Sequence, residues 1–120
     1  MNKKTVVLGA SLNPTKYSYL AITRLVDNNH SVRALGRKEG EVNGVKIYTS
    51  QKIFRDIDTV TIYLSKKNQV GFYSYIIALN PKRVLFNPGT ENVEFEKLLS
   101  KNNIFFERAC TLVLLGIGEY

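Results

Sequence analysis

Short apolar runs rich in β-branched residues alternate along this chain with longer segments of amphipathic, helix-like spacing. The five main strand-like runs are residues 5–9, 31–35, 59–64, 83–86 and 104–106, and a smaller one is residues 45–47. The helix-like segments are residues 14–28, residues 66–79 and a stretch that starts at Thr90 or Asn92 and ends near Lys101. This alternation predicts an α/β fold, in which a Rossmann-like, doubly wound, mostly parallel five-stranded sheet carries helices on both faces.

Local composition adds finer expectations. No linker, repeat or low-complexity tract interrupts the pattern, so residues 1–120 are expected to form one domain. Residues 36–40 are expected to be a loop, and Asn43-Gly44 a turn. A short helix is expected over residues 50–54, Ser65 is the expected cap of the helix that follows it, and residues 111–115 are a closing apolar segment.

The loop after residue 9 carries the clearest indication of a ligand site. An apolar strand runs into a turn of small residues, in which Asn13 is a candidate helix N-cap and Pro14 the expected first helical residue. Unpaired amides at a helix start, together with the helix dipole, favour a phosphate. The residues expected to approach a phosphate here are small, hydroxylic or basic: Gly9, Ala10, Ser11, Lys16 and Ser18.

The loop after the second strand discriminates between nucleotides. The first loop does not match G-x-G-x-x-G, because only Gly9 fits that pattern. Folds that bind NAD place an Asp or Glu after the second strand to hold the ribose 2′-hydroxyl. This chain has Gly36, Arg37 and Lys38 there, and two cations favour a phosphate on the adenosine ribose. The pattern disfavours NAD and allows NADP or coenzyme A.

Two further loops follow strands of the expected sheet, and ligands bind beyond the carboxyl ends of such strands. Leu64 and Ser65 end the central strand, where backbone amides and the serine hydroxyl face the first loop and the adenine or pyrophosphate. Asn87, Pro88 and Gly89 follow the next strand and are expected at the far end of the groove, where a pantetheine arm would run.

In their order along the chain, these motifs resemble the small stand-alone CoA-binding domains, which are similar to the N-terminal domain of succinyl-CoA synthetase α subunits. The matching pieces are Gly-Ala-Ser-x-Asn-Pro at 9–14, Lys-Tyr-Ser at 16–18, Gly-Arg-Lys at 36–38, Ile-Tyr-Leu-Ser at 62–65, Asn-Pro-Gly at 87–89 and Ala-Cys-Thr at 109–111. The resemblance covers nearly the whole chain and implies a Rossmann-type fold that binds coenzyme A.

The resemblance also implies a role for each matching residue. Gly9, Ala10, Ser11 and Asn13 would hold the pyrophosphate, and Lys16, Tyr17 and Ser18 would support it from the helix start. Lys38, with Arg37, would reach the 3′-phosphate.

Two departures from the family pattern limit what carries over. Gly36-Arg37 stands where the family usually has Asn-Pro, and the synthetase's second domain, with its phosphorylated histidine, has no counterpart in this sequence. Ligase activity therefore does not carry over.

Composition narrows the function classes. Seventeen Lys and Arg against ten Asp and Glu give a formal net charge of +7, which favours an anionic partner. Nucleic acid is one such partner, but most of the thirteen aromatic residues (Tyr 7, Phe 6) fall at expected core positions rather than on a stacking platform. No apolar run approaches the roughly 20 residues of a membrane span, no secretory signal is evident, and we interpret the chain as cytoplasmic.

Little in the sequence indicates catalysis or a metal. His30 is expected at the surface, and a single His with a single Cys has no metal-ligand spacing. Cys110 is interpreted as half-buried, with reaction as a nucleophile or as a partner for the CoA thiol left open. The function predicted is binding of coenzyme A or an acyl-CoA without evident catalysis, and the alternatives are an NADP-dependent oxidoreductase-like domain and a basic nucleic-acid-binding protein.

Overall fold

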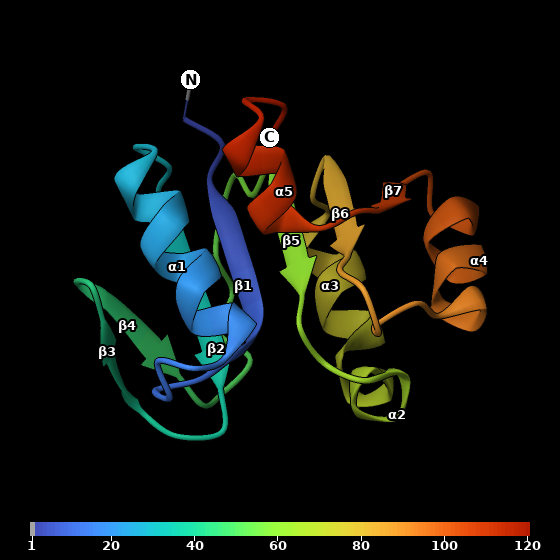
Figure 1. The fold of residues 1–120 in the computed structure, drawn as a ribbon. Helices are drawn as coiled ribbons and strands as arrows, with labels where there is room; N and C mark the ends of the chain where they lie inside the picture. Colours follow the sequence, from blue (N-terminus) through green and yellow to red (C-terminus); the bar gives the residue numbers. More distant parts are fainter. Residues whose placement is uncertain (1) are drawn as a thin grey trace.

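The structure is a computed structural model that describes residues 2–120, and it is built around one sheet (Figure 1). The strands are β1 (Thr5–Ala10), β2 (Val32–Gly36), β3 (Gly40–Val42), β4 (Val45–Tyr48), β5 (Thr59–Ile62), β6 (Arg83–Phe86) and β7 (Phe105–Arg108). The helices are α1 (Tyr17–Asp27), α2 (Lys66–Gln69), the 3-10 turn η1 (Val70–Phe72), α3 (Tyr73–Leu79), α4 (Val93–Lys101) and α5 (Thr111–Gly116).

Over residues 2–120 the sheet has seven strands, in the order β3-β4-β2-β1-β5-β6-β7. Every neighbouring pair is parallel except β3 and β4, which are antiparallel. The predicted α/β class with a mostly parallel sheet is confirmed, and the Rossmann-like description is consistent with it. The first strand, β1, lies in the middle of the sheet. The chain adds β2, β3 and β4 on one side of it and then β5, β6 and β7 on the other, so the strand order reverses between β1 and β5.

The predicted count of five strands is wrong, because the chain adds a small hairpin at one edge. Residues 36–40 look like a polar loop, yet Gly40 already pairs with Ile47 as the first residue of β3. Asn43 and Gly44 form the predicted turn with φ angles of 48° and 82°. Positive φ at both positions is what a tight two-residue hairpin requires, and it folds β3 back onto β4.

Three helix predictions need correction at their boundaries. The first helix begins at Tyr17, with Lys16 at the N-cap position, and not at Pro14. The second predicted helix divides into α2, η1 and α3, and the side chain of Ser65 makes no capping hydrogen bond. Residues 50–54 form no helix. Of the two predicted starts of the next helix, Thr90 and Asn92, the structure has Asn92: it is the N-cap of α4, and its side chain accepts a hydrogen bond from the amide of Phe95.

Helices cover both faces of the sheet, as the alternation predicts. On one face, the apolar sides of α3 and α4 pack against Val6 and Leu8 of β1 and the matching residues of β5 and β6. On the other face, Ile22 and Leu25 of α1 pack against Val7 and β2, and Leu114 of α5 joins them. Figure 1 shows α1 and α5 in front of the sheet and α3 behind it. Among residues 2–120, no helix is long and apolar enough to cross a membrane.

Candidate ligand-binding cleft

A cleft of about 930 Å³ lies across the carboxyl ends of the central strands. Its walls come from the β1–α1 loop, the segment after β2, the loop between β5 and α2, and the loop between β6 and α4. The reversal of strand order between β1 and β5 lies beneath it, which is where doubly wound sheets bind ligands. The volume falls within the range usual for small-molecule and cofactor sites.

Glycine allows β1 to enter the cleft at Gly9. The backbone there has a φ of +93°, and the parallel register with β2 shifts between Leu8 and Ala10. A Cβ at this position would lie 2.9 Å from the carbonyl oxygen of Tyr63, so β1 and the end of β5 approach as closely as a glycine permits. The next residues, Ala10 and Ser11, line the wall of the cleft.

The β1–α1 loop is held by its own side chains. Ser11 Oγ accepts a hydrogen bond of 3.0 Å from the amide of Asn13. Asn13 Oδ1 accepts from the amide of Thr15 at 3.0 Å and from its hydroxyl at 2.8 Å, so Asn13 stabilises a turn before the helix rather than capping it. The first amides of α1, those of Tyr17 and Ser18, have no carbonyl acceptor within the helix and are available to an anion.

Three cations line one half of the cleft: Lys16 before α1, and Arg37 and Lys38 after β2. All three side chains are exposed. The two ion pairs found within residues 2–120, Arg83–Glu107 and Arg108–Glu96, involve none of them. No Asp or Glu is among the lining residues of the described chain, so this half of the cleft has an uncompensated positive charge.

The opposite half is uncharged and rests on buried amide side chains. Asn87, which is 2% exposed, donates to Thr61 Oγ1 at 2.7 Å and to the carbonyl oxygen of Ile62 at 2.9 Å. Its Oδ1 accepts a hydrogen bond of 2.8 Å from the amide of Thr111. Asn87 therefore fixes the ends of β5, β6 and α5 relative to one another beneath the cleft.

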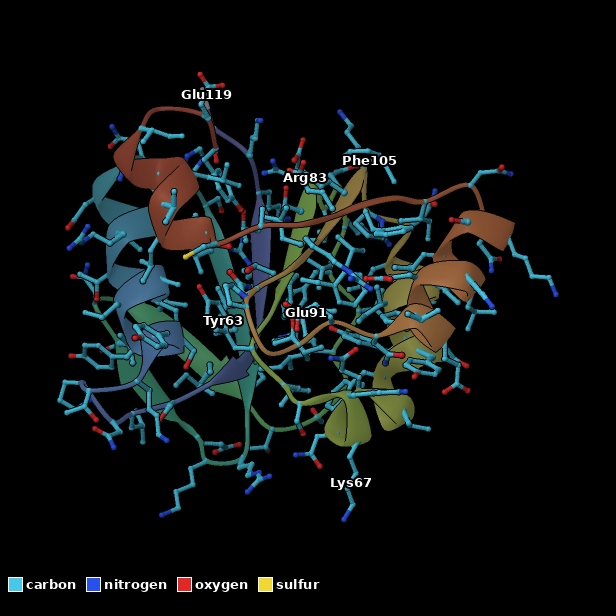
Figure 2. All side chains as sticks on the ribbon, turned by 45° about the vertical axis from the view of Figure 1, so that its right-hand side comes forward. Tyr63, Lys67, Arg83, Glu91, Phe105 and Glu119 are labelled. Carbon is cyan, nitrogen blue, oxygen red and sulfur yellow. The ribbon has the colours of Figure 1, made fainter. Side chains whose placement is uncertain are left out.

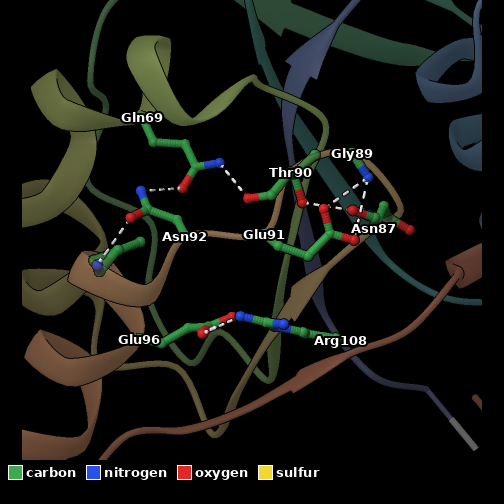
Figure 3. A network of polar contacts seen from close by, with 9 residues as sticks. Gln69, Asn87, Gly89, Thr90, Glu91, Asn92, Glu96 and Arg108 are labelled. Carbon is green, nitrogen blue, oxygen red and sulfur yellow. Dashed lines mark hydrogen bonds and ion pairs between the residues drawn. The ribbon is translucent and has the colours of Figure 1, made fainter.

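Gln69 connects the two loops that form this uncharged half (Figure 3). Its side chain is fully buried, and its Nε2 donates to the carbonyl oxygens of Leu64 at 2.9 Å and Thr90 at 2.7 Å. Asn92 in turn donates to Gln69 Oε1 at 2.9 Å and to the Tyr73 hydroxyl at 2.8 Å. One buried amide thus sets the separation of the β5–α2 and β6–α4 loops.

The structure brings almost all of the sequence-predicted site residues to this one cleft. Those that line it are Gly9, Ala10, Ser11, Asn13, Lys16, Tyr17, Ser18, Gly36, Arg37, Lys38, Leu64, Ser65, Pro88 and Gly89. Pro14 and Asn87 are outside the lining. Pro14 is exposed in the turn before α1, and Asn87 is buried below the cleft floor.

Seven further residues line the cleft that were not predicted from the sequence: Leu12, Leu35, Thr49, Tyr63, Asn68, Phe72 and Thr90. Leu35 and Tyr63 lie at the carboxyl ends of strands, so the rule that ligands bind beyond those ends also indicates them. Thr49 gave no such signal, because its place depends on the unexpected pairing of β4 with β2.

Of the residues with the most distinctive chemistry, Cys110 and His30 lie outside the cleft and Tyr63 lines it. Cys110 is half-buried, as interpreted from the sequence, and it does not line the cleft. Burial raises the pKa of Tyr63 well above its ordinary value. His30 is not simply a surface residue, because it is half-buried, its Nδ1 accepts a hydrogen bond of 2.9 Å from the amide of Lys3, and its ring packs against Tyr120. Within residues 2–120, no group of three or more His, Cys, Asp or Glu side chains is placed to hold a metal ion.

A doubly wound sheet with a glycine turn, a helix start and unpaired cations at its switch point has the design of a nucleotide-binding domain. The CoA binding domain family model matches residues 3–116, which is nearly the whole chain, and the chain belongs to this family. No curated protein matched it.

Solved structures extend the comparison. A crystal structure of an uncharacterized protein is 46% identical, with a TM-score of 0.97, and the match covers 100% of this chain and 99% of the other. A hypothetical protein from Pyrococcus horikoshii OT3 is 24% identical, with a TM-score of 0.85, over 93% of this chain and 80% of that one. The dinucleotide-forming acetyl-coenzyme A synthetase 1 of Ca. Korarchaeum cryptofilum has the same fold at 16% identity and a TM-score of 0.71, over 88% of this chain and 25% of the synthetase.

Proposed function

We propose that this domain binds coenzyme A, free or acylated, in the cleft above β1 and β5 and carries out no chemistry of its own. The observation that carries the proposal is the grouping of Lys16, Arg37 and Lys38 on a cleft without acidic lining, in a chain of the CoA binding domain family. Coenzyme A has three phosphate groups, and unpaired cations together with helix-start amides are what such groups need.

The pyrophosphate is assigned to the β1–α1 loop. Ser11 Oγ accepts from the Asn13 amide, so its own hydrogen is available for a phosphate oxygen. The amides of Tyr17 and Ser18 and the charge of Lys16 face the same wall. Gly9 and Ala10 lack a bulky side chain, so the ligand can approach the backbone closely.

The 3′-phosphate is assigned to Arg37 and Lys38. These residues follow β2 at the position where dinucleotide-binding folds read the adenosine ribose. Both side chains are exposed and without an ion-pair partner among the described residues, so a ligand phosphate has no internal carboxylate to displace.

NADP is the main competing ligand, because its 2′-phosphate suits the same two cations. It has no pantetheine arm to fill the uncharged half of the cleft. That half is lined by Leu64, Phe72 and Pro88 and extends past β5 to the β6–α4 loop. A cleft of this shape is better filled by a nucleotide with a long uncharged arm.

A thermal-shift series at fixed ionic strength tests the proposal with CoA, dephospho-CoA, NADP and NAD. A ligand that binds the native state raises the melting temperature by mass action. We expect the largest rise with CoA, a smaller one with dephospho-CoA and none with NAD. A larger rise with NADP than with CoA would favour the oxidoreductase-like alternative, and no rise with any ligand would contradict a nucleotide site in this cleft.

Lys38→Glu, compared with Lys82→Glu, tests the assignment of the 3′-phosphate. Lys82 is also exposed, lies just before β6 and does not line the cleft, and its substitution changes the net charge equally. We expect Lys38→Glu to weaken CoA about tenfold or more and dephospho-CoA much less, because only the extra phosphate meets the reversed charge. Equal effects of the two variants would remove Lys38 from the site.

A further inference from the structure

The two halves of the cleft differ in charge, and this difference orients a ligand. The cations are confined to the half formed by the β1–α1 loop and the segment after β2. The half formed by the β5–α2 and β6–α4 loops is lined by uncharged residues, among them Leu64, Ser65, Pro88, Gly89 and Thr90. If the phosphates of coenzyme A occupy the cationic half, the thiol end of the arm, with any acyl group, reaches the uncharged half.

The donor groups of Gly89 and Thr90, the two residues of the β6–α4 loop that line the cleft with N–H or O–H groups, already have partners inside the protein. Thr90 Oγ1 donates to the carbonyl oxygen of Asn87 at 2.7 Å, and the carbonyl oxygen of Thr90 accepts from Gln69 at 2.7 Å. The amide of Gly89 donates to both carboxylate oxygens of Glu91, at 3.0 and 3.2 Å (Figure 3). The amide of Thr90 also donates to the carbonyl oxygen of Asn87, at 3.0 Å. Gly89 and Thr90, which line the cleft, therefore offer no unused donor to a carboxylate at the end of an acyl chain.

Glu91 also places a negative charge beside this end of the cleft. Its carboxylate has no ion pair within residues 2–120. Arg108, the guanidinium in its vicinity, is engaged by both oxygens of Glu96 at 2.9 Å each. Lys66 and Lys67 of α2 are exposed and do not line the cleft, and Figure 2 shows Lys67 directed away from the ribbon into solvent.

Resting on the proposed function, we propose that the domain accepts coenzyme A with a neutral acyl group, or with none, and discriminates against acyl groups that end in a carboxylate. Glu91 is the residue that determines this specificity. It occupies the amide of Gly89 that a ligand carboxylate would bind, and its negative charge repels such a carboxylate at this end of the cleft.

Calorimetric titration of the whole chain with CoA, butyryl-CoA and succinyl-CoA at fixed ionic strength tests the proposal. The two acyl groups have the same number of carbon atoms, and at neutral pH one of them ends in a carboxylate. We expect butyryl-CoA to bind within about twofold of CoA and succinyl-CoA about fivefold to tenfold more weakly, which is the scale of one repulsive charge pair near a protein surface. Glu91→Gln keeps an oxygen for the Gly89 amide and removes the charge.

The variants separate this specificity from general electrostatics. We expect Glu91→Gln to bring succinyl-CoA to within about twofold of butyryl-CoA. Glu94→Gln removes an exposed carboxylate in the first turn of α4 that does not line the cleft, and it should leave the ratio unchanged. The ratio of the affinities for butyryl-CoA and succinyl-CoA is measured on the wild-type chain, so the proposal can be tested even if Glu91→Gln folds poorly.

The outcomes also distinguish this proposal from the one beneath it. If CoA fails to bind the wild-type chain, the proposed function fails, and the specificity fails with it. If CoA binds and succinyl-CoA binds as tightly as butyryl-CoA or more tightly, the proposed function stands and the specificity is overturned. Tighter binding of succinyl-CoA would mean that its carboxylate displaces Glu91 from the Gly89 amide.

Discussion

The carbonyl oxygen of Ala10 lies so close to Gly36 that a Cβ on Gly36 would come within 2.4 Å of it. These residues are partners at the carboxyl ends of the parallel strands β1 and β2. Both also line the cleft, one before the β1–α1 loop and the other before Arg37 and Lys38. The contact therefore sets the spacing between the two loops to which the phosphates are assigned.

Gly36→Ala should destabilise the fold and weaken ligand binding together. A backbone oxygen cannot move aside as a flexible side chain can, so the strands must separate, at a cost of about 1–3 kcal/mol in the free energy of unfolding. Denaturant unfolding gives the stability, and CoA titration gives the affinity. The control is Gly71→Ala, where an added Cβ meets nothing within 4 Å. Equal stability of the two variants would contradict the role of the Ala10–Gly36 contact.

Asn87→Ala should cost far more stability than Asn68→Ala. Removal of the Asn87 side chain leaves Thr61 Oγ1, the carbonyl of Ile62 and the amide of Thr111 without this partner, in a buried place. We expect a loss of about 3 kcal/mol in the free energy of unfolding, since each buried unpaired group costs about 1–3 kcal/mol. Asn68 is exposed, and its substitution should stay within about 0.5 kcal/mol. Thermal or urea unfolding measures both.

How far the sequence predicted this site depends on the kind of residue. The loops after residues 9, 35, 64 and 86 were located correctly, because strand ends are recognisable and parallel strands place their carboxyl ends on one edge. The buried roles of Asn87 and Gln69 were not predicted, because a polar residue in a loop or on a short helix looks the same in sequence whether it faces water or the interior. The turn at Asn43-Gly44 and the small strand at residues 45–47 are predicted and found, but β3 is not predicted, because its three residues give too little periodicity.

Gln69→Leu should weaken binding of the pantetheine arm of coenzyme A while it leaves binding of the nucleotide part nearly unchanged. Leucine keeps much of the volume but gives no donor to the carbonyls of Leu64 and Thr90, so the two loops lose their common anchor. We expect CoA to bind about fivefold more weakly or worse, while adenosine 3′,5′-bisphosphate, which lacks the arm, binds within about twofold of its wild-type affinity. Titrations are made at a temperature at which circular dichroism shows the variant folded. An equal loss for both ligands would mean that Gln69 only supports the fold.

Alkaline pH should destabilise the domain through its buried tyrosines. Burial raises the pKa of Tyr75 to about 12, and burial also raises the pKa values of Tyr63 and Tyr120. A raised pKa in the folded state means that the native protein holds the proton more tightly than the unfolded chain does. The stabilisation is therefore complete below pH 10 and is lost as the pH rises from about 10 to 12.

Tyr75→Phe isolates one share of this pH dependence. The variant loses the hydrogen bond from the Tyr75 hydroxyl to the carbonyl of Lys52 and so starts from a lower stability. Its free energy of unfolding should then fall less steeply between pH 10 and 12. The slope against pH should differ from that of the wild type by up to the amount that corresponds to about one bound proton. Tyr17→Phe, at an exposed tyrosine, should leave the slope as in the wild type. A slope unchanged in Tyr75→Phe would contradict the shifted pKa.

The most direct test of the central claim is an NMR titration of the 120-residue chain with coenzyme A, followed through its backbone amide resonances. The account predicts saturable shifts that group at the cleft, with Ser11, Ser18, Arg37 and Lys38 in the phosphate half and Gly89 and Thr90 at the arm end. Dephospho-CoA should leave the resonances of Arg37 and Lys38 much closer to their unbound positions. Shifts centred on another surface, or no saturable shifts at all, would contradict the binding of coenzyme A in this cleft.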